Sequence, residues 1–341
     1  MAGELVLITG VTGFIGFRVL VTALQAGYRV RGVIRRAEQA ESLKATASVK
    51  PYVKQLEFVV VPDILKDGAF DEAVQDVVYI EHLASPLASK AAGPEDYQSE
   101  LIEPAVKGTT GILASAKKSA SVKRVVITSS AVTILSFKDL ALVESDRVFS
   151  HKDTIEPESA PYVNNFHAYC ASKSFALYAG KQFLATQQPR FDIIHVLPTF
   201  VIGKNELVTV GADYASSGTN SYAFKPLVGV QAASPLPGIT VHVDDVAAVH
   251  VAALAPSVAG NQDFVVSSNG VEGTEWADAL DIAASHFPAA VKDGRLPLGG
   301  SQPTKKLHID ASYTEQVFGL KFKTYEDQIV SLVGHYLELL G

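Results

Sequence analysis

Residues 5–16 read LVLITGVTGFIG, an apolar run that leads into three glycines at positions 10, 13 and 16. This pattern predicts a buried strand over Leu5–Thr9, followed by a glycine turn and a helix. Gly10 would permit the tight turn, Gly13 would let the backbone approach a pyrophosphate, and Gly16 would let the helix pack close to the strand. A simple turn that requires a positive φ angle is the alternative explanation of the glycines.

The rest of the first 200 residues alternates apolar runs with helix-length segments, which is typical of βαβ units in a parallel sheet. We predict strands at residues 5–9, 28–34, 56–61, 77–83, 125–129 and 193–197. We predict helices at residues 13–26, 68–75, 104–118 and 168–185. Most of these strands are almost entirely apolar, as strands covered by helices on both faces must be. The predicted fold class is therefore α/β, with a doubly wound parallel Rossmann sheet.

After Pro198 the composition shifts to Ser, Gly, Ala and Tyr with little periodicity, and an amphipathic helix is predicted at residues 325–340. We predict a nucleotide-binding Rossmann domain over residues 1–200 and a smaller substrate-binding lobe over residues 201–341. Residues 241–243 and 264–267 are predicted to be strands that return to the sheet. The C-terminal lobe would then interleave with the Rossmann domain.

The length of 341 residues favours roughly two domains. Lys and Arg total 29 against 36 Asp and Glu, and the net charge of -7 has the wrong sign for a protein whose main partner is a nucleic acid. Cys170 is the single cysteine, so neither an intramolecular disulfide nor a cysteine-ligated zinc site can form. The best candidate for a membrane span, residues 246–255, is too short, and no signal sequence is apparent. We therefore expect a cytoplasmic protein without membrane or nucleic-acid partners.

Two arginines, Arg35 and Arg36, follow the second predicted strand, where a carboxylate would accept hydrogen bonds from a ribose 2'-hydroxyl. Guanidinium groups would pair there with a 2'-phosphate, so the sequence favours NADP(H) over NAD(H). A solvated surface pair is the alternative, and the nearby Glu38 keeps it open. Asp63 and Ile64, after the third strand, would meet the adenine, although an ordinary turn explains them equally well.

The strongest sign of catalysis is YCASK at residues 169–173, in which Tyr169 and Lys173 share one face of a predicted helix. An ammonium about 4 Å away, at an effective dielectric of about 20, would supply the roughly 4 kcal/mol that lowers a tyrosine pKa from about 10 to about 7. Ser130, which follows Thr128 at the end of the fifth strand, would donate to a substrate carbonyl. Tyr169 would protonate the developing alkoxide as hydride arrives, and Lys173 would also hold the ribose hydroxyls.

Together these motifs resemble the extended short-chain dehydrogenases/reductases, in the branch of dihydroflavonol reductases, cinnamoyl-CoA reductases and fungal carbonyl or methylglyoxal reductases. The resemblance covers essentially the whole chain and rests on residues 9–16, 35, 61–64, 82–86, 126–130, 169–173, 197–199 and 242–247. It implies a catalytic triad of Ser130, Tyr169 and Lys173. Gln39 departs from the pattern, because some relatives carry a second basic residue there, so Arg36 would have to compensate. We interpret residues 242–247 as a structural turn into a helix.

Residues predicted to bind the cofactor come from the motifs and from the resemblance. They are Gly10, Thr12, Gly13, Phe14, Ile15, Gly16, Arg35, Arg36, Asp63, Ile64, Leu83, Ala84, Ser85, Thr128, Tyr169, Lys173, Pro198 and Val201. The predicted substrate-binding residues are Pro86, Val132, Phe137, Phe166, Thr199 and Tyr222. The segments that contain these substrate-binding residues are largely apolar and aromatic, which suits an alkyl or aryl ketone or aldehyde better than a sugar nucleotide.

The sequence thus predicts an NADPH-dependent carbonyl reductase that acts on a small molecule, as a monomer or homodimer. No metal site is predicted, since the histidines lack metal-ligand spacing. Two alternatives stay open. An NAD-dependent sugar-nucleotide epimerase would share the fold and the triad, and a non-catalytic NADP sensor would share the fold without needing the triad.

Overall fold

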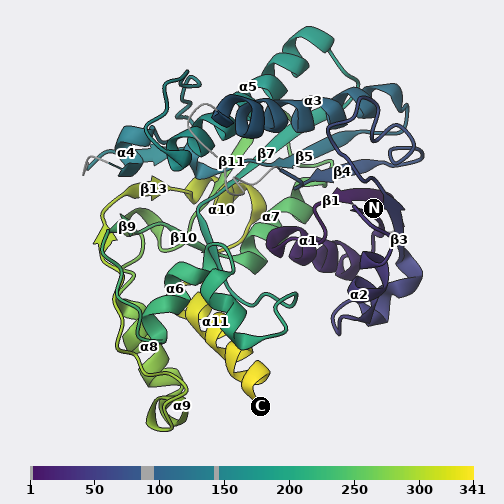
Figure 1. The fold of residues 1–341 in the computed structure, drawn as a ribbon. Coiled ribbons are helices and arrows are strands. Elements are labelled where there is room, and N and C mark those ends of the chain that lie inside the picture. The colour runs from purple at the N-terminus through teal and green to yellow at the C-terminus, as the bar shows by residue number, and fades with distance from the viewer. Residues whose placement is uncertain (1–2, 86–95, 142–145) are drawn as a thin grey trace. The chain divides into compact units, whose positions relative to one another are not determined.

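The computed structural model describes residues 3–85, 96–141 and 146–341 (Figure 1). It divides into two compact units, each assembled from three stretches of the chain. The first unit comprises Met1–Phe137, Thr154–Leu197 and Ala247–Phe264. The second unit comprises Lys138–Asp153, Pro198–Val246 and Val265–Gly341.

A seven-stranded sheet runs through the structure in the order β11-β7-β5-β4-β1-β2-β3. Its strands are β1 (Leu5–Thr9), β2 (Arg29–Ile34), β3 (Leu56–Val60), β4 (Tyr79–His82), β5 (Arg124–Thr128), β7 (Asp192–Pro198) and β11 (Asp263–Val266). Every pairing from β3 through β7 is parallel. The α/β class and the parallel Rossmann sheet are therefore confirmed, and each of the six strands predicted in the first 200 residues is present.

Helices cover both faces of this sheet (Figure 1). Those of the first unit are α1 (Phe14–Gln25), α2 (Gln39–Ala45), α3 (Glu103–Lys118) and α5 (Asn165–Gln187), with short helical turns η1 (Lys50–Gln55), η3 (Gln98–Ile102) and η4 (Ala131–Thr133). The chain runs from β1 towards β3 in one direction and from β4 towards β7 in the other. Because parallel crossovers are right-handed, α1 lies on one face, and α3 and α5 lie on the opposite face.

The helix predicted over residues 68–75 is absent, because this segment is a series of turns. Gly68 adopts a φ of +71°, a conformation that does not continue a helix. The carboxylate of Asp71 instead accepts hydrogen bonds from Ser115 and Lys118 on α3, both at 2.7 Å. These side-chain contacts fasten the turns to the neighbouring helix.

The core of the first unit lies where the apolar strands meet α3. Leu7, Ile80 and Val125 on the strands pack with Ile112 and Leu113 of the helix, and all five are fully buried. Each such side chain contributes roughly 1.5–3 kcal/mol of hydrophobic stabilisation. The order of the strands reverses between β1 and β4, and sheets of this kind bind ligands beyond the carboxyl ends of the strands at such a reversal.

The second unit contains short strand pairs and several helices. Its strands are β6 (Val148–Ser150) with β13 (His308–Asp310), β8 (Phe200–Ile202) with β10 (Thr240–His242), and β9 (Leu236–Pro237) with β12 (Thr304–Lys305). Its helices are α6 (Asn220–Leu227), α8 (Asp278–His286), α9 (Pro288–Lys292), α10 (Ser312–Phe318) and α11 (Tyr325–Leu340), with η5 (Gly211–Ser216) and η6 (Gly270–Glu272). Two further helices, α4 (Phe137–Ala141) and α7 (Val243–Ala253), contain residues of both units.

The core of the second unit surrounds Trp276, which is 1% exposed and donates its indole N–H to the Pro237 carbonyl at 3.0 Å.

Of the two strands predicted to return to the sheet, β11 joins it beside β7, whereas residues 240–242 pair with β8 in a separate sheet. Helix α11 matches the prediction and starts with a capping box between Thr324 and Asp327. Within the described residues, no helix combines the length and apolarity needed to cross a membrane.

Candidate active site

The turn after β1 is shaped by its glycines. Gly10 has a φ of +77°, and a Cβ added there would lie 2.9 Å from the backbone nitrogen of Ala84. A Cβ added to Gly16 would lie 2.1 Å from the carbonyl oxygen of Gly10, closer than any side chain can approach. The backbone N–H of Gly13 donates to the same oxygen at 2.9 Å and closes the turn. The sequence therefore needs glycine at positions 10 and 16 for steric reasons.

The N-terminus of α1 is suited to an anion. The helix starts after Gly13, and among the described residues no side chain caps it and no acidic residue lies in its first turn. The first N–H groups of a helix lack partners within the helix, and its dipole favours negative charge at this end. The residues present therefore fit the pyrophosphate of a dinucleotide.

Thr9, the last residue of β1, fixes the loop that follows β4. Its Oγ1 accepts hydrogen bonds from the backbone N–H groups of Leu83 and Ala84, both at 3.0 Å. The same hydroxyl lies 3.0 Å from Nδ1 of His82. Because two N–H groups already donate to this oxygen, its own proton goes to Nδ1 of His82. Burial lowers the pKa of His82 to about 4, with a further contribution from the Lys173 charge, so the ring is neutral and can accept.

Helix α5 carries two of the three predicted catalytic residues. Its start is set by Asn164, whose side chain accepts a hydrogen bond from the backbone N–H of His167 at 2.9 Å. One turn further, Tyr169 and Lys173 share a face, and the Lys173 ammonium lies 5.8 Å from the centre of the tyrosine ring. The ammonium also donates to Oγ of Ser85, in the loop after β4, at 3.0 Å.

The third predicted catalytic residue, Ser130, immediately precedes η4, just beyond the end of β5. Its hydroxyl lies close enough to the phenol of Tyr169 to act on it as a hydrogen-bonding group and to lower its pKa. The structure thus brings Ser130, Tyr169 and Lys173 together at the carboxyl end of the sheet. Since Ser85 belongs to the loop that Thr9 holds, a continuous set of contacts joins these three side chains to the glycine turn.

The protonation of this site differs from the expectation that Lys173 lowers the pKa of Tyr169. Burial raises the pKa of Tyr169 to about 12, although its hydrogen bond with Ser130 acts in the opposite direction. Burial also lowers the pKa of Lys173 to about 8. The expectation fails because the sequence shows the helical spacing of the two side chains but not the cost of removing both from water. Tyr169 therefore keeps its proton at neutral pH.

The two arginines predicted to select the phosphate lie at the exposed end of β2. Gln39 has a structural role there, because its side-chain oxygen accepts hydrogen bonds from the backbone N–H groups of Arg35 and Arg36, both at 3.0 Å. The side chain of Arg36 forms an exposed ion pair with Glu38 at 3.3 Å. Such pairs contribute at most about 1 kcal/mol, so an incoming phosphate can compete with Glu38.

A protein-family model matches the part of the chain that contains this site. It is described as "NAD dependent epimerase/dehydratase family", and it matches residues 6–208, which include the glycine turn and all three predicted catalytic residues. The chain belongs to this family. The predicted resemblance to extended short-chain dehydrogenases/reductases is thereby confirmed.

Relatives whose names state an activity indicate the branch of the family. The chain is 40% identical to ketoreductase CTB6 of Cercospora nicotianae over 345 residues, which covers 99% of this chain and 96% of that protein. It is 29% identical to aldehyde reductase 2 of Sporidiobolus salmonicolor, over 89% of this chain and 87% of that protein. The crystal structure of yeast methylglyoxal/isovaleraldehyde reductase Gre2 complexed with NADPH aligns with a TM-score of 0.81 and 28% identity over 99% of both chains. The predicted reductase branch and class of enzyme are confirmed.

Several other family positions predicted to bind ligands lie in the second unit or outside the described residues. Pro198, Thr199, Val201 and Tyr222 belong to the second unit, where Thr199 donates its backbone N–H to the Val266 carbonyl at 3.1 Å. Pro86 lies outside the described residues. Near β3, the carboxylate of Asp63 accepts the Leu65 N–H at 2.9 Å, which is the turn geometry considered above as an alternative to adenine binding.

Two predicted substrate-binding residues in the first unit differ in exposure. Phe166 is 42% exposed, and its ring stacks 6.3 Å from that of Tyr169, so it can contact a molecule bound at the phenol. Phe137 is buried and stacks on the ring of His167 at 4.3 Å, where it packs against the start of α5. Cys170 is buried as well, and burial raises the pKa of its thiol to about 12.

A buried network beneath the site escaped the sequence analysis. Glu81 on β4 and His250 on α7 are both fully buried, with Oε2 of the carboxylate 2.7 Å from Nδ1 of the ring. The other ring nitrogen lies 2.9 Å from Oγ1 of Thr128, two residues before Ser130. Burial raises the pKa of Glu81. A glutamate within the mostly apolar run at residues 77–83 was the signal available in the sequence, but the sequence does not show its partner.

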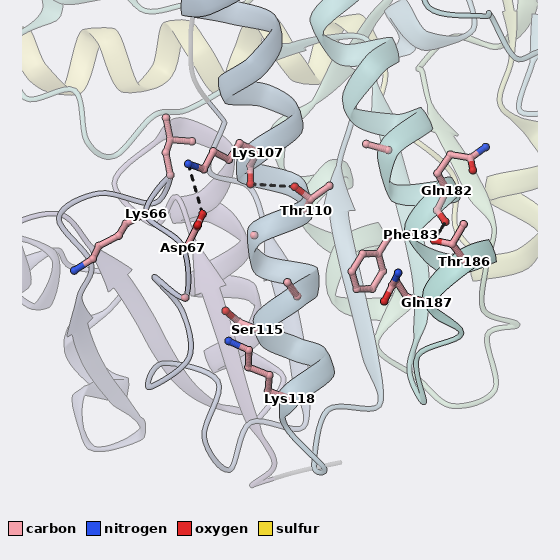
Figure 2. A pocket seen from close by; sticks show the side chains of 15 residues that line it. Lys66, Asp67, Lys107, Thr110, Ser115, Lys118, Gln182, Phe183, Thr186 and Gln187 are labelled. Atoms are coloured by element: carbon pink, nitrogen blue, oxygen red, sulfur yellow. Dashed lines mark hydrogen bonds and ion pairs between the residues drawn. The ribbon is translucent and has the colours of Figure 1, made fainter.

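A groove on the surface of the first unit lies away from the three predicted catalytic residues. Figure 2 shows a groove between α3, α5 and the loop at residues 65–68, where the Lys107 ammonium lies 3.5 Å from the Asp67 carboxylate. None of Ser130, Tyr169 and Lys173 lines this groove. Its polar lining residues, such as Gln182 and Thr186, belong to exposed helix surfaces. We assign it no part in the reaction.

Proposed function

We propose that this protein reduces a small ketone or aldehyde to an alcohol with NADPH, and that Tyr169 is the proton donor. The observation that carries the proposal is the meeting of Tyr169, Ser130 and Lys173 at the sheet edge that also holds the glycine turn. The names of the relatives, a ketoreductase and an aldehyde reductase, support carbonyl reduction. A cytoplasmic location belongs to the same proposal.

Each catalytic side chain has a distinct task. The bound dinucleotide supplies the hydride that reaches the carbonyl carbon. Ser130 donates a hydrogen bond to the carbonyl oxygen and polarises the C=O bond. Tyr169, whose pKa of about 12 keeps it protonated, transfers its phenolic proton to the same oxygen as negative charge develops there. Lys173 places a positive charge beside the phenolate that remains.

The preference for NADPH rests on the arginines at the end of β2. Arg35 and Arg36 carry two positive charges at the position where a 2'-phosphate would lie, and the described residues place one carboxylate, Glu38, against them. Charge-assisted hydrogen bonds from guanidinium to phosphate are among the stronger ones in proteins. The NADPH complex of Gre2 supports this choice.

The test is a spectrophotometric assay of NADPH oxidation at about 340 nm with methylglyoxal, isovaleraldehyde and a series of aryl ketones. We expect NADPH to be consumed much faster than NADH with at least one of these carbonyls. We expect Tyr169→Phe to abolish turnover while NADPH binding, measured by fluorescence, persists. Undiminished turnover by this variant would remove Tyr169 from the mechanism, and purification with tightly held NAD would favour an epimerase.

A further inference from the structure

Two fully buried polar side chains lie beside the strand that leads to Ser130. Glu81 on β4 and His250 on α7 are both 0% exposed, and Oε2 of the carboxyl lies 2.7 Å from Nδ1 of the ring. The proposed mechanism gives neither of them a task. A buried pair of this kind is often no more stabilising than two apolar side chains, so stability alone does not explain its presence.

The buried pair contacts the candidate site through Thr128, the last residue of β5. Nε2 of His250 lies 2.9 Å from Oγ1 of Thr128. Among the described residues, this is the one hydrogen bond of the Thr128 hydroxyl. Thr128 also lines the same small cavity as Ser85 and Lys173, which are both predicted to bind the cofactor. Its side chain therefore links the buried pair to the cofactor-binding end of the sheet.

The end of β5 determines where the Thr128 side chain points. The backbone N–H of Ser129 still donates to the Val196 carbonyl at 2.8 Å, so the pairing with β7 continues past Thr128. Ser130 is extended as well, with a φ of -162° and a ψ of 152°. Because successive side chains of an extended chain point to opposite faces, Thr128 and Ser130 point to the same face. A contact that orients Thr128 therefore acts next to Ser130.

Helix α7 is held beside β5 independently of His250. Arg124, the first residue of β5, donates from Nη1 to the carbonyls of Ala253 and Ala255, at 2.6 Å and 2.7 Å. It also donates from Nη2 to the Val258 carbonyl at 2.7 Å. The C-terminal end of α7 is thus fixed to the start of the strand, and His250 joins the same helix to the end of the strand. Removal of the His250 ring should leave the helix in place.

The burial of the pair determines which ring nitrogen carries a proton. A net charge on a fully buried pair is strongly disfavoured, so the pair holds either a neutral carboxyl and a neutral ring or a carboxylate and an imidazolium. In the first form the carboxyl proton lies on Oε2 and is donated to Nδ1, because Oε1 of Glu81 has no hydrogen-bond partner among the described residues. The proton of the neutral ring is then on Nε2. In the second form both ring nitrogens carry protons.

The Thr128 hydroxyl accepts a hydrogen bond from His250 in both forms. A hydroxyl has one proton and two lone pairs, and one lone pair receives the Nε2 proton. The proton of Thr128 is then available to another acceptor. A ring without a proton on Nε2 would instead take this proton, and Thr128 could then only accept from a ligand.

We propose that Glu81 and His250 are positioning residues that make Thr128 a hydrogen-bond donor to an oxygen atom of the bound dinucleotide. The inference rests on the proposed function for the identity of that ligand, NADPH. Thr128 contacts the ligand, His250 acts through Thr128, and Glu81 acts through His250.

Titration of the enzyme with NADPH, followed by fluorescence, tests the donor without any turnover. Thr128→Val removes the hydroxyl and should raise the Kd about threefold to tenfold, which is the effect of one neutral hydrogen bond. Thr128→Ser keeps a hydroxyl and should restore most of the affinity. Thr110→Val is the matched control, because its hydroxyl bonds within α3, to the Val106 carbonyl at 2.9 Å. A wild-type Kd for Thr128→Val would refute the proposal.

Glu81→Leu/His250→Leu tests whether the buried pair acts through Thr128. This double variant leaves neither polar group buried without its partner, and thermal unfolding checks that it folds. We expect its Kd for NADPH to rise about twofold to fivefold, because binding must then order a hydroxyl that can rotate. Addition of Thr128→Val should leave the double variant no weaker than Thr128→Val alone. A wild-type Kd in the double variant, or independent losses in the triple variant, would refute the positioning role.

NMR of protein labelled with heavy nitrogen in its histidine rings tests the protonation without ligand or activity. We expect a proton on Nε2 of His250, assigned by the loss of its signal in His250→Gln. A ring protonated on Nδ1 alone would overturn the proposal, since Thr128 would then donate to His250. Turnover by Tyr169→Phe would refute the proposed function and leave these results unchanged, whereas an inactive Tyr169→Phe with a wild-type Kd in Thr128→Val would refute only this inference.

Discussion

Oγ1 of Thr9 and Nδ1 of His82 lie 3.0 Å apart at the point where the strand order of the sheet reverses. This hydroxyl ties the end of β1 to the end of β4 and to the two residues that follow it. Ser85, next in the chain, then accepts a hydrogen bond from Lys173. One threonine therefore aligns the glycine turn with helix α5.

Thr9→Val should destabilise the protein and weaken cofactor binding. The isosteric change leaves the N–H groups of Leu83 and Ala84 without their acceptor, at a cost of about 1–3 kcal/mol for each group that stays dry. Urea unfolding and NADPH titration measure the two effects. Thr186→Val is the control, because its hydroxyl bonds only within α5, to the Gln182 carbonyl at 2.8 Å. Equal stability of the two variants would contradict the bridging role.

Arg35→Ala should impair the use of NADPH and leave the use of NADH almost unchanged. Hydrogen bonds to charged groups contribute about 1.5–3 kcal/mol, so KM for NADPH should rise about tenfold to a hundredfold. Steady-state kinetics with both cofactors give the comparison. Arg36→Ala should have a smaller effect, since Glu38 already occupies that side chain. A parallel loss with NADH would mean that Arg35 does not meet a 2'-phosphate.

Carbonyl reduction should slow as the pH rises through about 8. Burial lowers the pKa of Lys173 to about 8, so the ammonium loses its proton above that pH, and with it the charge beside the phenolate. In the unfolded chain this lysine has a pKa of about 10.4, so below about pH 8 its buried charge destabilises the folded state. This destabilisation decreases as the pH rises from about 8 to about 10.4, and above that range the group is neutral in both states. The pH profile of kcat/KM reports the free enzyme. The Lys173→Arg variant should be slower than the wild type but should lack this decline, because arginine keeps its charge. A wild-type profile that stays flat to about pH 9.5 would show that loss of the Lys173 proton does not limit the reaction.

His250→Leu should destabilise the protein by about 3–5 kcal/mol, because it leaves the buried Glu81 carboxyl without its partner. The double variant Glu81→Leu/His250→Leu should recover much of that loss, since it removes both polar groups. Denaturant unfolding of the four proteins in this cycle gives the coupling energy. Strictly additive losses would show that the two groups do not interact.

The fold was predictable where neighbouring residues decide the structure. Apolar runs such as Leu5–Thr9 identify buried strands, and the glycines at 10 and 16 identify the turn that follows. Residues 68–75 have a helical composition, but Gly68 and the contacts of Asp71 with α3 hold them as turns. Strand pairing is non-local, so the pairing of residues 240–242 with β8 was not visible in the sequence.

In the candidate site, too, residues with a local sequence signal could be predicted, whereas contacts between distant parts of the chain could not. Tyr169 and Lys173 could be found because their spacing is local to one helix. Glu81 and His250 are 169 positions apart, and Thr128 and His250 are 122 positions apart, so only the folded chain brings each pair together. The raised pKa of Tyr169 depends on burial, which the sequence pattern does not measure.

The thiol of Cys170, the single cysteine, lies within helix α5 and has a pKa of about 12, because burial raises it and the nearby Glu158 charge adds to the effect. A thiol that stays protonated reacts slowly with alkylating reagents and peroxides. The enzyme should therefore survive iodoacetamide and storage in air without a reductant. Cysteines introduced on its surface could then be labelled selectively with dyes, with no need to replace the native one.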